Sequence, residues 1–239
     1  MTLPCPTAGV RVDARPSQTW SLRQNRPVLT DDMCRRFLGA LGVKTPLKLT
    51  IDVDLPLGAG CGMSTAALVA LARAVGTDET RITGACIAVE GASDPTMLGV
   101  PDGVLWAPRE GQTLGDIPPP PRAGIVGGLW GPPTRTDPED ANFPPIDDLV
   151  ADWSSGPDVT RAAEIAAESA RRTTALRGPK ADPTEALARD LGALGFARAH
   201  TGSARAMIFL LGQVPDRAED AMRRAGYAHV MRFQTGGRA

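Results

Sequence analysis

The chain has 239 residues, a formal net charge of −1 and an apolar content of 42%. Its near-neutral charge and 4% aromatic content argue against a nucleic-acid partner. No apolar run approaches the roughly 20 residues that cross a bilayer, and the start, MTLPCPTAGV, lacks the features of a signal peptide. We therefore expect a cytoplasmic protein with neither nucleic-acid nor membrane partners.

In the first half of the chain, residue periodicity predicts three strands and three helices. In order, these are a strand at 9–14, a helix at 31–41, a strand at 47–55, a helix from Ser64, a helix at 80–89 and a strand at 104–107. Thr30 or Asp31 is the expected cap of the first helix. The apolar content is sufficient for a buried core behind these elements.

The most informative segment is 47–74, where a strand, a glycine-rich loop and a helix follow one another. Residues 47–55 alternate between apolar and polar side chains, and Pro56 ends the strand because proline lacks an N–H. Gly58, Gly60 and Gly62 permit a tight turn and a close approach of the backbone to a ligand. Ser64 then opens a helix whose free N–H groups favour an anion. This segment predicts a phosphate or nucleotide site.

The second half begins at the prolines 118–121, which cannot enter a helix or a sheet and mark a predicted linker. The elements predicted after it are a strand at 123–129, helices at 158–176 and 183–194, a strand at 204–211, a helix at 216–225 and a strand at 227–233. This order predicts an antiparallel sheet with helices on one face. We expect an α+β protein with domains at 1–117 and 118–239.

Two common nucleotide-binding patterns do not fit the loop. A Walker loop ends in Gly-Lys-Ser/Thr, and this loop has no lysine. A dinucleotide fingerprint follows a strand buried on both faces, whereas this strand carries Lys48, Thr50, Asp52 and Asp54.

The loop resembles the Pro-x-x-x-Gly-Leu-Gly-Ser-Ser-Ala-Ala motif of the GHMP kinases. Five residues stand at the family's positions, namely Pro56, Gly60, Gly62, Ser64 and Ala66. Three others differ, because Cys61 replaces Leu, Met63 replaces the first Ser and Thr65 replaces the first Ala. The resemblance implies a two-domain fold with an N-terminal part like domain 2 of ribosomal protein S5 and a ferredoxin-like C-terminal part.

The same resemblance implies ATP and Mg²⁺ as cofactors. The implied ATP-binding residues of the loop are Pro56, Leu57, Gly58, Ala59, Gly60, Cys61, Gly62, Met63, Ser64, Thr65 and Ala66. Within the family, the chain is similar to the L-threonine kinases of cobalamin biosynthesis and salvage. That similarity rests on the loop, the acidic pair in VEGASDPTM, the proline run and following strand at 118–126, Ala-His-Thr-Gly-Ser at 199–203 and Thr-Gly-Gly at 235–237.

The narrower similarity assigns roles to the acidic pair and to the second-half motif. It implies that Ser64 and Glu90 hold Mg²⁺ and that Asp94 is the base for the acceptor hydroxyl. It also implies that Thr201, Gly202 and Ser203 approach the phosphates. Taken alone, the acids also fit a helix end and an Asp-Pro turn, and 199–203 also fits an ordinary turn with a glycine cap.

The implied activity is phosphorylation of L-threonine by MgATP, giving O-phospho-L-threonine for the aminopropanol arm of cobalamin. Two alternatives remain: a GHMP kinase for another small alcohol, such as a homoserine-like acceptor, and a catalytically lapsed nucleotide-binding protein with a regulatory role. Family members begin with a strand carrying a Cys-Gly-Glu-type segment that lines the substrate pocket, and this chain starts without it, at MTLPCPTAG. A homodimer is a compatible assembly.

Overall fold

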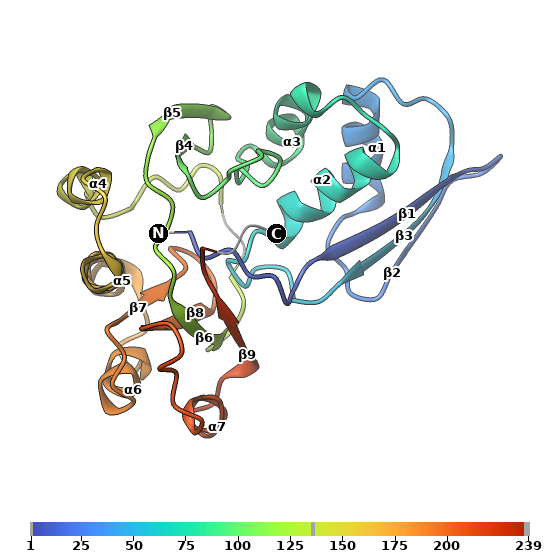
Figure 1. The fold of residues 1–239 in the computed structure, drawn as a ribbon. Coiled ribbons are helices and arrows are strands. Elements are labelled where there is room, and N and C mark those ends of the chain that lie inside the picture. Colours follow the sequence, from blue (N-terminus) through green and yellow to red (C-terminus); the bar gives the residue numbers. More distant parts are fainter. Residues whose placement is uncertain (1, 135–136, 237–239) are drawn as a thin grey trace.

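The computed structural model describes residues 2–134 and 137–236, which form three sheets with helices packed against them (Figure 1). In chain order the elements are β1 (Val10–Pro16), β2 (Ser21–Gln24), α1 (Asp31–Ala40), β3 (Leu47–Val53), α2 (Met63–Ala74), a 3-10 turn (Glu79–Arg81), α3 (Ile82–Glu90), β4 (Val104–Ala107), β5 (Gln112–Asp116), β6 (Gly124–Leu129), α4 (Asp147–Ser154), α5 (Val159–Arg177), α6 (Thr184–Asp190), β7 (Gly195–Arg198), β8 (Ala204–Phe209), α7 (Ala218–Arg224) and β9 (Ala228–Gln234). The α+β class predicted from the sequence is confirmed.

The first sheet places β3 between β1, which is antiparallel to it, and β2, which is parallel. The predicted alternation holds, because the apolar side chains of β3 are buried and Lys48 and Thr50 are exposed. Leu49 and Ile51 are fully buried in a core that also contains residues of α1, α2 and α3. Each such side chain contributes about 1.5 to 3 kcal/mol on burial. This core fixes the start of α2 at the end of β3.

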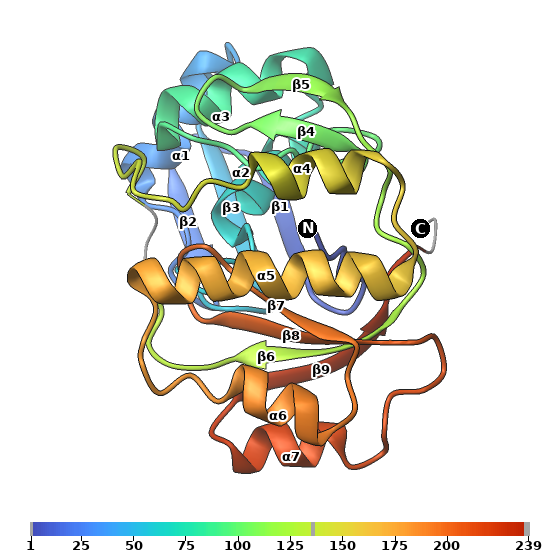
Figure 2. The ribbon, with the colours of Figure 1, turned by 90° about the vertical axis from the view of Figure 1, so that its left-hand side faces the viewer.

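The second large sheet has the strand order β7-β8-β6-β9, and all its neighbouring strands are antiparallel. This is the order of a ferredoxin-like sheet, as predicted. Its helices, however, lie on both faces: α6 and α7 cover one face, and α5 crosses the other (Figure 2). The prediction of helices on one face was therefore wrong.

Helices lie on both faces of this sheet because its strand β6 is buried along its whole length and so must be covered on each side. Val126 packs in the cluster that includes α6 and α7, whereas Ile125 packs with Ala163 and Ala166 of α5. The small side chains of α5 allow a close approach to β7. A Cβ on Gly195 would lie 2.2 Å from the carbonyl oxygen of Ala163.

The segment predicted as a linker has no regular structure and joins the two halves of the molecule. Trp153 of α4 donates its indole N–H to the carbonyl of Pro118 at 2.8 Å, and the hydroxyl of Thr235 donates to the carbonyl of Pro121 at 2.7 Å. The domain boundary at 117/118 stays a prediction. Of the Thr-Gly-Gly motif, Gly237 lies outside the described residues. Among the residues described, no helix has the length and apolar character required to span a bilayer.

Candidate active site

The glycine-rich loop connects β3 to α2 and has the backbone conformation that the sequence predicts. Gly58, Gly60 and Gly62 have φ angles of 77°, 79° and 65°, in the left-handed region that favours glycine. Gly62 is the N-cap of α2, and no side chain caps this helix. The N–H groups of the first turn of α2, together with its positive dipole end, therefore form a site suited to a phosphate.

At the start of α2, two hydroxyl groups converge on Glu90, the last residue of α3. Ser64 Oγ donates to one carboxylate oxygen of Glu90, and Thr65 Oγ1 donates to the other at 3.0 Å. Burial raises the pKa of Glu90, the two hydrogen bonds oppose that shift, and the nearby Asp94 adds to it. The structure thus brings Ser64 and Glu90 together, as the sequence comparison implied.

Asp94 lies on the loop after α3, against the N-cap of α2. A Cβ on Gly62 would come within 2.9 Å of Asp94 Oδ2, so the carboxylate lies directly beside the helix start. The neighbouring residue is fixed, because Ser93 N–H donates to the carbonyl of Pro108 at 2.8 Å and the Trp106 indole donates to the carbonyl of Ser93 at 2.6 Å. The side chain of Asp94 reaches solvent, but the surrounding protein desolvates its carboxylate and raises its pKa.

The third predicted motif, residues 199–203, forms the turn between β7 and β8. Together with Ala204, the first residue of β8, it lies against the glycine loop as the turn 199–204. Ala204 N–H donates to the carbonyl of Ala59 at 2.7 Å. A Cβ on Gly202 would lie 2.5 Å from the carbonyl carbon of Ala59, so only glycine fits there. Ser203 is buried, and its carbonyl accepts from Trp130 N–H at 2.8 Å. Thr201 and Gly202 are partly exposed beside the loop.

The predicted loop residues 56–66 differ in whether their side chains or only their peptide groups can contact a ligand. The side chains of Ala59, Met63 and Thr65 are buried, so the peptide N–H groups are what these residues offer a phosphate. The remaining members are partly or fully exposed, namely Pro56, Leu57, Gly58, Gly60, Cys61, Gly62, Ser64 and Ala66. Burial raises the pKa of Cys61 to about 11, so it stays a neutral thiol near pH 7.

The residues at the helix start fit a magnesium ion. Ser64 and Glu90 are hydrogen-bonded to each other, so their oxygen atoms lie side by side. Mg²⁺ favours a few protein oxygens, with phosphate and water oxygens completing its coordination shell. A cation there would also stabilise the ionised form of Glu90 against its burial. Over residues 2–134 and 137–236, His, Cys, Asp and Glu form no group of three or more that could hold a metal by itself.

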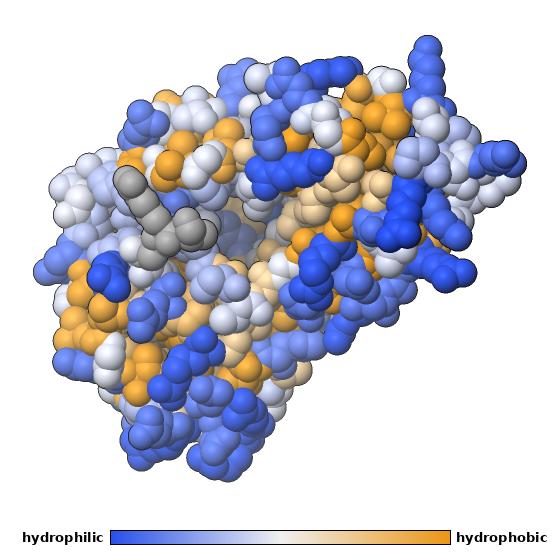
Figure 3. Space-filling model, turned by 45° about the vertical axis from the view of Figure 1, so that its right-hand side comes forward, coloured by the Kyte–Doolittle hydropathy of each residue, from blue (hydrophilic) through white to orange (hydrophobic). Residues whose placement is uncertain are grey.

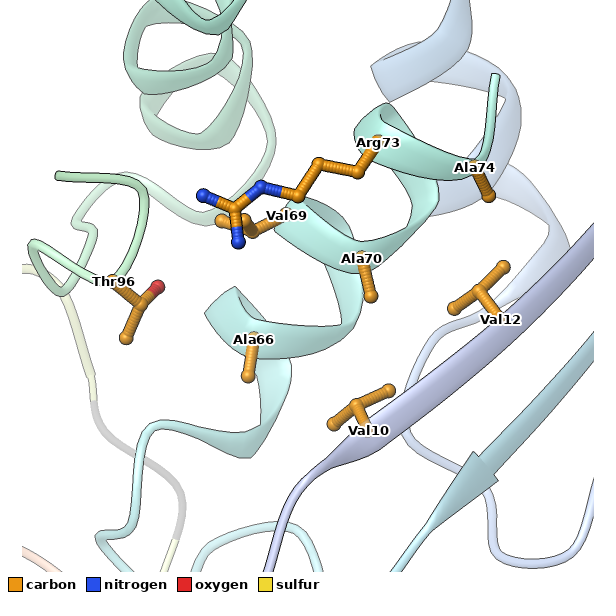
Figure 4. Close-up of a pocket in the computed structure, with 8 residues that line it drawn as sticks. All are labelled: Val10, Val12, Ala66, Val69, Ala70, Arg73, Ala74 and Thr96. Atoms are coloured by element: carbon orange, nitrogen blue, oxygen red, sulfur yellow. The ribbon is translucent and has the colours of Figure 1, made fainter. Parts of the chain in front are cut away.

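A groove of about 450 Å³ runs along α2 (Figure 4). Val10 and Val12 of β1 and one apolar stripe of α2 line it, with Arg73 at one end and Thr96 on the opposite loop. The Thr96 hydroxyl is buried and has no hydrogen-bond partner in the described structure. Thr96 follows Asp94 by two residues, so the groove begins close to the acidic pair. Figure 3 shows a hollow near the middle of the molecule in its view.

Residues 29–90 match the family model described as the GHMP kinases N terminal domain. Among solved structures, the fold is similar to mevalonate kinase from methicillin-resistant Staphylococcus aureus MRSA252, at 20% identity and a TM-score of 0.61 over 95% of this chain and 88% of that one. It is also similar to homoserine kinase from Cytophaga hutchinsonii, at 15% identity and a TM-score of 0.59 over 93% and 84% of the two chains. The fold is that of the GHMP kinases.

A further structure with the GHMP kinase fold, a 4-(cytidine 5'-diphospho)-2C-methyl-D-erythritol kinase, matches at 18% identity and a TM-score of 0.58, over 95% of this chain and 86% of that one. No curated protein matches the sequence significantly. The matched segment 29–90 contains the glycine loop, Ser64 and Glu90, but ends before Asp94.

Two residues beside this site were not predicted from the sequence. Arg205 and Asp182 form a buried ion pair behind the turn 199–204. A charge pair separated by 23 positions gives no local sequence signal, and a buried arginine in an otherwise apolar strand is the only hint.

Proposed function

We propose that this protein is an ATP-dependent kinase that phosphorylates the hydroxyl of L-threonine to O-phospho-L-threonine, a precursor for the aminopropanol arm of cobalamin. One observation supports the kinase chemistry above others: Ser64, Glu90 and Asp94 come together at the uncapped start of α2, beside the glycine loop. The choice of threonine rests on the sequence similarity to the L-threonine kinases. The GHMP kinase fold supports the wider class of acceptor, a small alcohol.

In this proposal the glycine loop and the first turn of α2 hold the phosphates of ATP through peptide N–H groups. Ser64 and Glu90 hold Mg²⁺, which neutralises charge between the phosphate oxygens when it is bound. These groups act mainly by positioning, since phosphoryl transfer requires little covalent participation from the protein.

Asp94 is the proposed base for the acceptor hydroxyl. It takes the hydroxyl proton as the acceptor oxygen bonds to the γ-phosphorus and the bond to the leaving ADP oxygen breaks. A carboxylate with a raised pKa is a better base than an ordinary one, provided that it is ionised at the working pH. Its place beside the helix start keeps it next to the phosphates that the loop would hold.

The groove along α2 is the proposed acceptor site. Its apolar walls suit the methyl group of threonine, and the unpartnered hydroxyl of Thr96 is free for a polar group.

A coupled ADP-release assay with L-threonine, L-serine, L-homoserine and mevalonate tests the proposal. We expect MgATP turnover that depends on L-threonine and that falls about a hundredfold to ten-thousandfold in Asp94→Asn. Asp102→Asn, on the same loop, is the matched control and should keep full turnover. A preference for homoserine or mevalonate would overturn the threonine assignment alone. MgATP binding without turnover of any acceptor would favour a lapsed, regulatory protein.

A further inference from the structure

The glycine loop and the turn 199–204 touch through backbone atoms and through the methyl group of Ala199, which lies against Gly60. Ala204 N–H donates to the carbonyl of Ala59 at 2.7 Å. A Cβ on Gly60 would lie 2.2 Å from the carbonyl oxygen of Thr201. Because the two backbones are in direct contact, a shift of the turn moves the loop as well.

A buried ion pair lies behind this turn and binds its carbonyl groups. The side chains of Arg205 and Asp182 are only 2% and 8% exposed, and Arg205 Nε donates to Asp182 Oδ2 at 2.6 Å. Arg205 Nη1 donates to the carbonyls of Gly202 at 3.2 Å and Ala204 at 2.9 Å. One guanidinium therefore ties Asp182 to two peptide groups of the turn.

Asp182 is itself held in place by the helix that follows it. Its Oδ1 accepts from both the N–H and the hydroxyl of Thr184, and the Thr184 hydroxyl contacts the Tyr227 hydroxyl at 2.7 Å. Burial opposes ionisation of Asp182, but these bonds and Arg205 outweigh it and hold its pKa below the ordinary value. The carboxylate is thus a fixed negative anchor for Arg205.

We propose that Arg205 and Asp182 are positioning residues that hold the turn 199–204, and through it the glycine loop, in the conformation that binds ATP. The assignment of the ligand rests on the proposed function. Stability alone does not require such a pair, because burying two charges costs solvation and apolar packing is often as stable. What an apolar pair cannot supply is directed hydrogen bonding to the carbonyls of Gly202 and Ala204.

Cysteine labelling tests the positioning without any nucleotide. Cys61 is part of the loop and partly exposed, whereas Cys34 and Cys86 are fully buried in the core. In a Cys5→Ser background, we expect Arg205→Met to raise the maleimide labelling rate of Cys61 about tenfold, as loss of hydrogen bonds to a charged group implies. The rates at Cys34 and Cys86, followed by peptide mass spectrometry, should not change.

Two further variants sharpen this test. Arg205→Lys keeps one charged donor and should give an intermediate rate, whereas Arg223→Met removes two exposed ion pairs on α7 and should leave the rate unchanged. An unchanged Cys61 rate in Arg205→Met would overturn the proposal. A parallel rise at all three cysteines would also overturn it, because it would indicate lost stability alone.

Calorimetry then connects the position of the loop to the ligand. We expect the Kd of MgATP to rise about tenfold in Arg205→Met and to recover partly in Arg205→Lys. A tenfold rise in labelling with an unchanged Kd would refute the link to ATP. If the wild type itself binds no ATP, the proposed kinase function fails, while the labelling result still decides whether the ion pair positions the loop.

Discussion

At the scale of single residues, the site contains two carboxylates, Glu90 and Asp94, in surroundings that disfavour their ionised form unless a cation is bound. Both oxygens of Glu90 accept hydrogen bonds, from Ser64 and Thr65, and yet burial still raises its pKa. Asp94 adds a second negative group close by. A bound cation would relieve this cost, so the residues that would hold the metal destabilise the protein when the metal is absent.

Glu90→Gln should therefore raise the free energy of unfolding at neutral pH in the absence of metal. The pKa of Glu90 is higher in the folded state than its ordinary 4.5. Between pH 4.5 and the raised pKa, the folded state therefore binds more protons than the unfolded state. Wild-type stability from this group is present below pH 4.5 and is lost as the pH rises through the raised pKa. Urea denaturation of both proteins across this range should show a difference that shrinks at low pH.

The opposite result, a variant that is less stable than the wild type at neutral pH without metal, would show that hydrogen bonding outweighs burial at Glu90. Added Mg²⁺ and ATP provide a second comparison. They should stabilise the wild type more than Glu90→Gln, because a ligand that binds only the folded state stabilises it according to its affinity.

At the scale of elements, the strand, loop and helix of 47–74 could be predicted because each residue acts locally there. Alternating apolar residues predict β3, although it ends at Val53, two residues before the predicted end. One proline and three glycines predict the loop, and α2 begins at Met63, one residue before the predicted start. The capping prediction for α1 is confirmed as well, since Thr30 Oγ1 accepts from Met33 N–H at 3.1 Å.

Other elements were missed because their stability comes from distant contacts. β2 and β7 have only four residues each: β2 is held by pairing with β3, more than 20 residues further along the chain, and β7 by close packing of Gly195 against Ala163 of α5. The helix α4 follows a proline-rich acidic stretch, and it is held by packing of Leu149 and Trp153 against α5. The position of α5 opposite α6 and α7 depends in the same way on packing rather than on its own sequence.

The close contact between the glycine loop and the turn predicts a strong effect of Gly60→Ala. Gly60 and Gly76 both have positive φ angles, of 79° and 72°, but only a Cβ at Gly60 would meet the backbone, at 2.2 Å. We expect Gly76→Ala to cost about 1 to 2 kcal/mol for its φ alone, and Gly60→Ala about 1 to 3 kcal/mol more. Chemical denaturation measures both, and equal costs would contradict the backbone contact.

At the scale of the whole molecule, the candidate site is assembled from both halves of the chain. The glycine loop, Glu90 and Asp94 come from the first half, and the turn 199–204 from the second. Two backbone hydrogen bonds link the halves beside the loop: Ala204 N–H donates to the carbonyl of Ala59, and Thr134 N–H donates to the carbonyl of Gly58. The sequence identified both sides, but not the contact between them or the ion pair of Arg205 and Asp182, which lie apart along the chain.

The central claim is that residues 56–66 and Glu90 form a site for MgATP, and isothermal titration of ATP with and without Mg²⁺ tests it most directly. We predict binding by the wild type that strengthens when Mg²⁺ is added. In Ser64→Ala this strengthening should fall roughly tenfold, because one metal-side oxygen is lost. Ser17→Ala changes a partly exposed serine far from the site in sequence and should behave as the wild type. Failure of the wild type to bind ATP, or an equal response to Mg²⁺ in Ser64→Ala, would contradict the claim.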